Sequence, residues 1–378
     1  MLSKKNKGIT LVALVVTIVV LLILAGISIS ALTNTGIFQK AKEAKQKSAN
    51  AELDQNTKLD SYEEEISNYL PQDVKQAIKK GKPLSTDKNT EIADEKGNKI
   101  VIPAGFKVTG DATTVDKGIV IEDATVDSNG NATPTNGSQF VWVPVGKITK
   151  ADGTKTTITL GRYDFDETAG TESAYSGDLV EEDTNNLSTL KNIEGKSIAK
   201  NITNFKNSVK ANGGYYIGRY EARKTTARND EGNTLTQITE KGTDQIYNYV
   251  TQKQAAEQAQ GMYTSNNFTS DLINSYVWDT AIIFIQKCTD KTNYANKNSL
   301  NTSFLSTGTT NDNPCNIFDM ASNVREWTTE TSSDSSYPCV RRGGDCNSSD
   351  VYTSTRGYDD TSGSYSSIGF RPLLYINV

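Results

Sequence analysis

The chain has 378 residues, a formal net charge of −5 and 22% charged residues, so it has no basic excess that would indicate a nucleic-acid partner. It has no histidine, which excludes histidine general bases, Ser-His and Cys-His nucleophile pairs, and the commonest side-chain ligand of transition metals. The length allows two or three domains, of which at least one can bury a large core. We therefore expect no nucleic-acid partner and no histidine-based active site.

An apolar run near the N-terminus has the length of a membrane-spanning helix. Residues 9–31 carry no charged side chain, and at about 1.5 Å per residue they would cross a hydrocarbon core of roughly 30 Å. Lys4, Lys5 and Lys7 precede the run, which places the N-terminus in the cytoplasm. We expect a protein of the bacterial cell membrane, anchored through residues 9–31, whose C-terminal domain is extracytoplasmic or on the cell surface.

The residues around Gly8 indicate how this segment is processed. Lys7 and Gly8 are followed by the apolar sequence ITLVAL. This pattern resembles the type IV prepilin signature, in which a basic residue and a glycine precede a hydrophobic helix. The resemblance implies cleavage between Gly8 and Ile9 and allows pilin-like assembly. Ala13 stands where pilins usually carry a glutamate, so an uncleaved signal anchor is the alternative.

A helical stalk and a small β-rich region are expected next. Apolar residues recur at helical spacing through 36–70, and Pro71 ends the run. Short apolar runs at 99–102, 106–108 and 118–121 are then separated by turn residues. The predicted organisation is a leader at 1–8, a hydrophobic helix and stalk at 9–70, a β-rich linker region at 71–135 and a C-terminal domain at 136–378.

Hydrophobic islands separated by long polar loops characterise the C-terminal domain. A strand is expected at 139–145, and helices are expected near 251–262 and 277–288, before a series of short strands. This order is typical of an α+β domain rather than of a parallel βαβ sheet. The predicted fold class is therefore α+β, with a membrane-spanning pilin-like helix in front of the domain.

Several islands match the motifs of one family. The sequence reads GGYYIGRYEA at 213–222, DMASNVREW at 319–327, RGG at 342–344 and GFR at 369–371. These motifs, in this order, resemble the formylglycine-generating enzyme family from Asn136 to the C-terminus. The resemblance implies a C-type-lectin-like fold with little regular secondary structure and a ligand surface near the C-terminal strands.

The motif residues are interpreted as structural. Phe318, Met320, Trp327 and Phe370 are expected to be buried, and Arg371 is expected to pair internally. Tight turns account for the motif glycines.

Two enzymatic branches of this superfamily can be compared with the chain. The formylglycine-generating branch holds copper with two cysteines shortly after RGG, whereas here Cys346 follows Gly344 and no cysteine comes after it. The sulfoxide-synthase-like branch holds iron with histidines, which this chain lacks. We therefore expect no catalytic residue, no metal and no cofactor. The pairing of the four cysteines stays open.

A loop between the RGG and GFR motifs is rich in tyrosine and small polar residues. Residues 345–367 consist of Asn, Ser, Asp, Tyr, Thr and Gly, apart from Cys346, Val351 and Arg356. Codons for these residue types arise when the adenines of asparagine codons of the AAY type are replaced by other bases. The loop thus resembles the variable region of diversity-generating retroelement target proteins, which present mutable residues on a C-type-lectin-like scaffold. An ordinary polar loop is the alternative, since the same types dominate turns.

The leading hypothesis is a surface-displayed ligand-binding protein of this variable type, which contacts an unknown protein or glycan through tyrosine rings and adaptable small polar groups. The alternatives are a divergent formylglycine-generating-type oxidase that uses Cys346 and another cysteine, and a structural minor pilin. The predicted binding face, hereafter the candidate face, consists of Asp345, Asn347, Ser348, Ser349, Asp350, Tyr352, Gly357, Tyr358, Asp359, Asp360, Ser364, Tyr365, Ser366 and Ser367.

Overall fold

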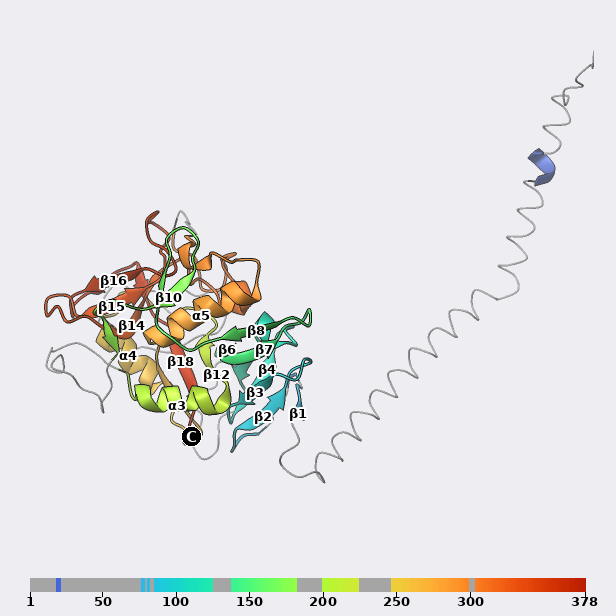
Figure 1. Cartoon of the computed structure of the whole chain (residues 1–378), viewed down its shortest axis with the longest axis horizontal. Helices are drawn as coiled ribbons and strands as arrows, with labels where there is room; N and C mark the ends of the chain where they lie inside the picture. Colours follow the sequence, from blue (N-terminus) through green and yellow to red (C-terminus); the bar gives the residue numbers. More distant parts are fainter. Residues whose placement is uncertain are drawn as a thin grey trace, which may run out of the picture. The chain divides into compact units, whose positions relative to one another are not determined.

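The computed structural model describes residues 18–21, 76–78, 80–81, 85–124, 137–181, 199–223, 246–298 and 303–378. The chain divides into two compact units, Met1–Val74 and Lys75–Val378. The described residues of the first unit, 18–21, are helical. The second unit is called the body, and Figure 1 shows its sheets and helices.

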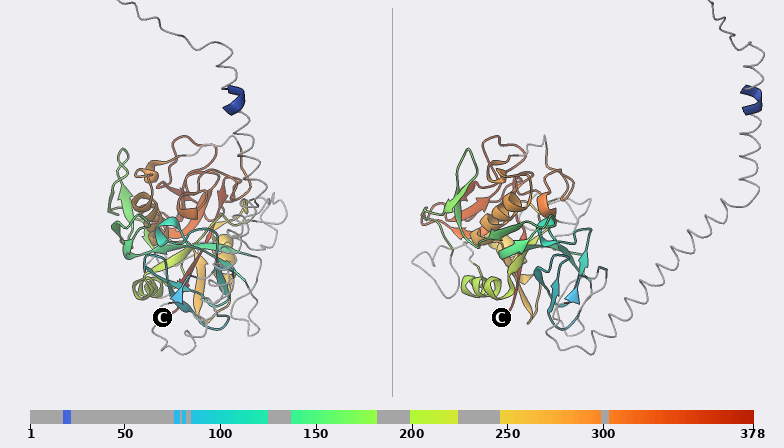
Figure 2. Two further views of the ribbon diagram at one scale, coloured as in Figure 1. Left: turned by 90° about the vertical axis from the view of Figure 1, so that its right-hand side faces the viewer. Right: turned by 45° about the vertical axis from the view of Figure 1, so that its right-hand side comes forward.

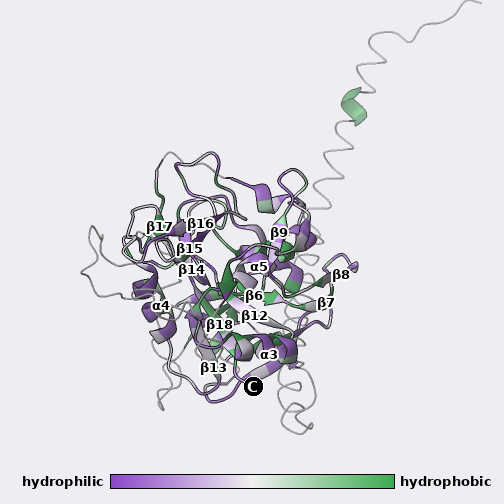
Figure 3. Ribbon diagram, turned by 60° about the vertical axis from the view of Figure 1, so that its left-hand side comes forward, coloured by the Kyte–Doolittle hydropathy of each residue, from purple (hydrophilic) through white to green (hydrophobic). Residues whose placement is uncertain are grey.

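The larger sheet of the body is antiparallel and six-stranded, and it forms the centre of the main core. Its three middle strands are almost wholly buried, which explains their continuous apolar sequences. Figure 3 shows hydrophobic residues gathered in the middle of the body, where β6 and β18 lie. In spatial order, the strands are β13 (Phe268–Leu272), β18 (Pro372–Ile376), β12 (Gly214–Gly218), β6 (Gln139–Pro144), β5 (Val120–Asp123) and β4 (Phe106–Thr109).

The smaller main sheet is five-stranded and carries most of the family motifs. Its strands are β11 (Val180–Glu181), β14 (Arg325–Thr331), β15 (Cys339–Arg342), β16 (Arg356–Asp359) and β17 (Ile368–Gly369). The central strand β14 pairs with β11 and β15 in antiparallel register and with β17 in parallel register. β15 in turn pairs with β16, so the candidate loop is part of this sheet.

The remaining described strands form smaller units. A three-stranded sheet has the order β1 (Gln76–Ala77), β2 (Thr90–Ala93) and β3 (Lys99–Ile102). Two hairpins consist of β7 (Gly146–Thr149) with β8 (Lys155–Ile158), and of β9 (Tyr163–Phe165) with β10 (Glu172–Ala174). Figure 1 and the right-hand view of Figure 2 show β1–β4 on one side of the body and β14–β16 on the other.

Within the described ranges, three α-helices pack on these sheets, and each begins at a polar capping residue. The side chains of Asn201, Thr251 and Asn274 each accept a hydrogen bond from a backbone N–H group in the first turn of the helix that follows. The helices are α3 (Ile202–Asn212), α4 (Gln252–Gly261) and α5 (Ser275–Cys288), and short 3₁₀ helices are η1 (Val115–Lys117), η3 (Tyr294–Asn296) and η4 (Pro314–Asn316). The largely buried α5 contacts both β6 and β14, so it joins the two main sheets.

Several local predictions are confirmed. The expected helices near 251–262 and 277–288 correspond to α4 and α5. The expected strands at 99–102 and 139–145 correspond to β3 and β6. β4 and β5, from the segment predicted as a linker region, pair within the same sheet as β6.

The predicted fold class is wrong. Among the described residues strands dominate and helices are few, whereas an α+β domain with little regular secondary structure was expected. Most of the strands are only two to five residues long, too short for a clear alternating pattern in the sequence. No helix in the described ranges has the length and apolarity needed to cross a membrane. Apart from 18–21, the predicted span at 9–31 lies outside those ranges, as does the predicted stalk at 36–70.

Candidate ligand-binding face

Three tyrosines of the candidate face project into solvent from different parts of the loop. The exposed fractions are 40% for Tyr352, 47% for Tyr358 and 46% for Tyr365. Tyr358 lies on β16, where it pairs with Val340 of β15, and the other two lie in the segments before and after this strand. One of the three aromatic side chains is thus presented by a sheet, and the other two by the segments that flank its strand.

The polar members of the candidate face divide by exposure. Asn347, Ser349 and Asp350 are exposed. Asp345 and Asp359 are buried, with exposed fractions of 2% and 9%. The half-buried members are Ser348, Gly357, Asp360, Ser364, Ser366 and Ser367.

The two buried aspartates hold the loop to the neighbouring strands. Asp345 Oδ2 lies 2.7 Å from Arg325 Nε, and its Oδ1 accepts the backbone N–H of Asn347 at 2.9 Å. Asp359 Oδ2 accepts from Arg341 Nε at 2.9 Å. Because both carboxylates are paired with arginines, they position the face, although the side chain of Asp359 remains 13% exposed.

Tyr337 is a fourth exposed tyrosine, just before a strand of this sheet, and is not among the predicted face residues. Its exposed fraction is 52%, and it comes two residues before β15, whose first residue, Cys339, pairs with Asp359. The preceding sequence, TSSDSS, has the same small polar composition as the candidate loop. This composition could have identified Tyr337 as a face residue, but the predicted face was limited to the loop that follows the RGG motif.

The motif residues form the frame beneath the loop. Arg371 is fully buried and donates from Nε to Glu326 Oε2 at 2.6 Å and from Nη2 to the Phe318 carbonyl at 2.8 Å. Asn323 Nδ2 donates to Glu221 Oε2 at 2.6 Å. The predicted internal pairing of Arg371 is confirmed, as is the predicted burial of the residues Phe318, Met320, Trp327 and Phe370.

The glycines of RGG allow a close approach between two motifs. Gly343 has a φ of 90°, and a Cβ on Gly344 would lie 2.4 Å from the Ala321 carbonyl oxygen. A side chain at either position would push the RGG turn away from the 319–327 segment.

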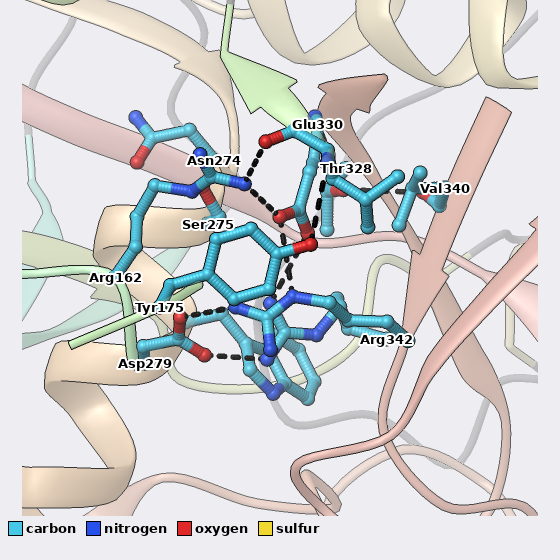
Figure 4. Close-up of polar contacts among 12 residues, drawn as sticks. Arg162, Tyr175, Asn274, Ser275, Asp279, Thr328, Glu330, Val340 and Arg342 are labelled. Carbon is cyan, nitrogen blue, oxygen red and sulfur yellow. Dashed lines mark hydrogen bonds and ion pairs between the residues drawn. The ribbon is translucent and has the colours of Figure 1, made fainter. Parts of the chain in front are cut away.

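A group of buried charges lies under the candidate loop, and Figure 4 shows most of it. This buried charge cluster consists of Arg162, Asp279, Glu330, Arg342 and Arg356. Asp279, Glu330 and Arg342 are fully buried. Arg342 Nη2 lies 2.5 Å from Asp279 Oδ1, and its Nη1 lies 3.3 Å from Glu330 Oε2. The cluster joins α5, β14, β15 and β16.

Arg356 connects the candidate loop to this cluster. Its Nη2 lies 2.6 Å from Asp279 Oδ2, and its Nε lies 3.2 Å from Glu330 Oε1. Its guanidinium carbon is also 4.3 Å from the centre of the Tyr175 ring. Burial alone would raise the pKa of Glu330, but Arg342, Arg356 and Arg162 lower it overall, so this carboxylate stays charged.

A polar cavity of about 410 Å³ opens beside the loop. It is lined by Asp164, Phe165, Glu167, Asn296, Tyr352, Ser354, Thr355 and Arg356. Tyr352 therefore belongs both to the candidate face and to the cavity wall. The other walls come from β9, the residues that follow it, and η3, all outside the predicted face.

Comparison with known proteins assigns the family. A family model described as the sulfatase-modifying factor enzyme 1-like domain (FGE-sulfatase) matches residues 126–374, which include the whole candidate face. The chain belongs to this family. As a sulfatase-modifying factor enzyme 1-like protein, it has a body of the C-type-lectin-like fold, as the motifs predicted. No curated protein matches the chain.

Solved structures similar to this sulfatase-modifying factor enzyme 1-like chain are distant. The Treponema denticola variable protein 1 has 12% identity and a TM-score of 0.35, covering 64% of this chain and 98% of its own. The Major Tropism Determinant I1 variant has 12% identity and a TM-score of 0.33, covering 82% of this chain and 88% of its own. Scores of this size do not establish a shared function.

The copper site that the family resemblance implies does not fit the residues present. Cys346 is buried, and burial together with Asp345 raises the pKa of its thiol to about 11, so the thiol stays protonated at neutral pH. In the described ranges no group of three or more cysteine, aspartate or glutamate side chains could hold a metal ion. Cu(I) prefers a pair of thiolates, and no second cysteine follows Cys346 in the sequence.

Two further features concern the predicted processing residues and the cysteines Cys288 and Cys315. Gly8 and Ile9 lie outside the described residues, so the predicted processing and the predicted location stay predictions. Cys288 and Cys315 are buried free thiols. Burial raises the pKa of Cys288 to about 12.

Proposed function

We propose that the chain is a surface-displayed ligand-binding protein whose candidate face contacts a protein or a glycan, in the manner of diversity-generating retroelement variable proteins. The observation that carries the proposal is the division of one loop into two sets of residues. Tyr352, Tyr358 and Tyr365 are exposed, while Asp345, Arg356 and Asp359 are held inward by ion pairs.

This division is what a mutable binding surface requires. Exposed side chains away from special interactions can be exchanged at a cost within about 0.5 kcal/mol, whereas loss of a buried charge partner costs several kcal/mol. Tyrosine rings provide contact area with little loss of conformational entropy, and serine, glycine and asparagine add adaptable hydrogen bonds. A loop of this composition can therefore change its ligand without changing its fold.

The proposal is tested first in the DNA of the producing cells. Sequencing of many copies of the segment that encodes residues 340–374 is expected to show substitutions concentrated at the exposed positions 347, 349, 350, 352, 358 and 365. A nearby reverse transcriptase gene and an adenine-rich copy of the segment are expected as well. Substitutions no denser here than in the rest of the gene, or equally frequent at buried positions, would contradict the proposal.

Binding itself is tested with arrays of glycans and of peptides. The full-length chain is expected to give signals that the variant Y352S/Y358S/Y365S loses. Thermal unfolding of both proteins provides the folding control. Unchanged array signals from a folded triple variant would show that the face is not the binding surface.

The family match over residues 126–374 fits the oxidase alternative, but the cysteine site does not. The thiol of Cys346 is buried and protonated, and the donor set for copper is incomplete. The minor pilin alternative depends on N-terminal residues that lie outside the described ranges.

A further inference from the structure

The cavity beside Tyr352 combines walls from three parts of the chain. Asp164, Phe165 and Glu167 come from β9 and the turn that follows it, and Asn296 comes from η3. Tyr352 and the neighbouring residues to Arg356 supply the wall from the candidate loop. At about 410 Å³, the cavity has room for one long side chain of a bound partner.

The charged side chains of the cavity wall differ in the partners that they already have. The guanidinium of Arg356 already has hydrogen-bond partners within the chain. It donates to Glu330, to the Tyr163 carbonyl at 3.1 Å and to Asp279. Asp279 and Glu330 also pair with Arg342 and Arg162, so the buried charge cluster has three arginines against two carboxylates and keeps one positive charge. Asp164 Oδ2 accepts from the backbone N–H and the hydroxyl of Ser176, at 2.8 and 2.9 Å, and both donors are neutral. The carboxylate charge of Asp164 is therefore not cancelled by a hydrogen-bond partner.

Glu167 adds a second negative charge. Its side chain is exposed, and within the described part of the chain it makes no hydrogen bond or ion pair. Asp164 and Glu167 thus present two negative charges to an incoming group, against the one surplus positive charge of the buried charge cluster. A cation is therefore attracted to the cavity while an anion is repelled.

Aromatic rings form the other recognition element. Phe165 and Tyr352 both line the cavity, where they can contact the methylene stem and the charged head of a cationic side chain. The body already uses this type of contact nearby, because the guanidinium carbons of Arg162 and Arg356 lie 4.4 and 4.3 Å from the centre of the Tyr175 ring.

We propose that this cavity binds an arginine or lysine side chain of a protein partner, with the cation at Asp164 and Glu167 and the stem against Phe165 and Tyr352. The proposal rests on the proposed function, because Tyr352 belongs to the candidate face. It specifies a protein with an exposed basic residue as the partner. A neutral sugar would leave the two carboxylates without a charge partner.

The test uses the full-length chain and small probes. Nα-acetyl-arginine methylamide is expected to bind with a Kd of about 1 mM, measured by calorimetry or ligand-observed NMR. The citrulline analogue has nearly the same shape without the charge and is expected to bind at least about ten-fold more weakly. Binding is also expected to weaken as NaCl is raised from about 0.05 to 0.5 M.

Variants locate the binding. Glu167→Gln is expected to weaken binding of the arginine probe about ten-fold. The matched control Glu257→Gln removes an exposed carboxylate from α4, away from the cavity wall, and is expected to leave binding unchanged. Equal binding of the citrulline analogue, equal effects of the two variants, or preferential binding of methyl glucoside would each overturn the proposal.

A further comparison separates this proposal from the proposed function. Tyr358 and Tyr365 do not line the cavity. Suppose that Y358S/Y365S abolishes array binding while the arginine probe fails to bind the unmodified chain. The candidate face is then supported as the binding surface, and the proposal for the cavity is contradicted. If the probe binds and Glu167→Gln abolishes that binding while Y358S/Y365S leaves array binding intact, the cavity stands and the wider face falls.

Discussion

At the scale of single residues, the decisive contrast is between arginines that point inward and tyrosines that point outward. Arg342 and Arg371 are fully buried and reach carboxylates on other elements, Asp279 of α5 and Glu326 of β14. The exposed Tyr358 lies on β16, next to a strand that carries Arg342. Substitutions at these two kinds of position should therefore have very different costs.

Arg371→Met tests this contrast. The substitution leaves Glu326 buried without its partner, so the free energy of unfolding is expected to fall by about 3–5 kcal/mol. Arg341→Met is the control, because its pair with Asp359 is partly exposed, and a loss of about 1 kcal/mol is expected. Urea unfolding measures both values. A loss for Arg371→Met no larger than that for Arg341→Met would contradict the assignment of the buried pair.

The sequence predicted some of these residue roles and missed others. The GFR and DMASNVREW motifs were enough to predict the burial of Trp327 and the internal pairing of Arg371. Asp345 and Asp359 were grouped with the exposed residues because composition alone cannot show which way an aspartate points. The pairing of β15 with β16 brings Arg341 to Asp359, and the turn after β15 brings Asp345 to Arg325 of β14. No local pattern in the sequence connects either pair.

At the scale of elements, β16 is the part of the candidate loop that is built into a sheet. It is paired with β15 along one edge, and Arg356 ties its first residue to Asp279 of α5 and Glu330 of β14. The strand is therefore fixed both by backbone hydrogen bonds and by buried charges.

Arg356→Met should loosen this strand. Asp279 and Glu330 lose one of their cationic partners, and backbone amides of residues 352–359 are expected to exchange hydrogen about ten-fold faster or more. Arg356→Lys keeps the charge but not the planar fork, so an intermediate effect is expected. Hydrogen exchange followed by mass spectrometry measures both variants, with α3 as the internal reference. Uniform acceleration across α3 and β16 would point to general destabilisation instead.

Elements with strong local signals were predictable, and the candidate site was only partly so. α4 has a capping box at Thr251 and Gln254, and α5 is a long apolar helix, so both could be located from the sequence. The buried charge cluster draws Arg162, Asp279, Glu330 and Arg356 from four separate segments, and no local pattern connects them. The same is true of the cavity wall contributed by Asp164 and Glu167.

At the scale of the whole molecule, the body keeps several carboxyl groups in surroundings that favour the neutral form. Burial raises the pKa of Asp123, Asp271 and Asp319 to about 6 in each case. Burial, with the charge of Glu330, raises the pKa of Glu181 to about 7. The folded chain therefore binds protons more tightly at these groups than the unfolded chain does.

This difference predicts a stability that falls with rising pH. Each raised group contributes fully below its unfolded pKa, near 4 to 4.5, and that contribution is lost as the pH rises through 6 to 7. Each of the three aspartates accounts for a fall of about 1.4 kcal/mol between pH 5 and 7.5 and Glu181 for about 2.4, so the free energy of unfolding is expected to fall by about 6 kcal/mol in all. Glu181→Gln should flatten this slope, whereas Glu257→Gln should not. A slope that is absent, or equal in both variants, would contradict the prediction.

The cavity has a consequence for any change of the candidate loop. Two of its walls, including Asp164 and Glu167, lie outside residues 345–367 and would persist when the loop sequence is exchanged. Versions of the protein with different loops would then differ in the contour of the surface they offer while sharing one attraction for basic groups. The preferred partner would change with the loop sequence, but every version of the protein would still favour a positively charged group.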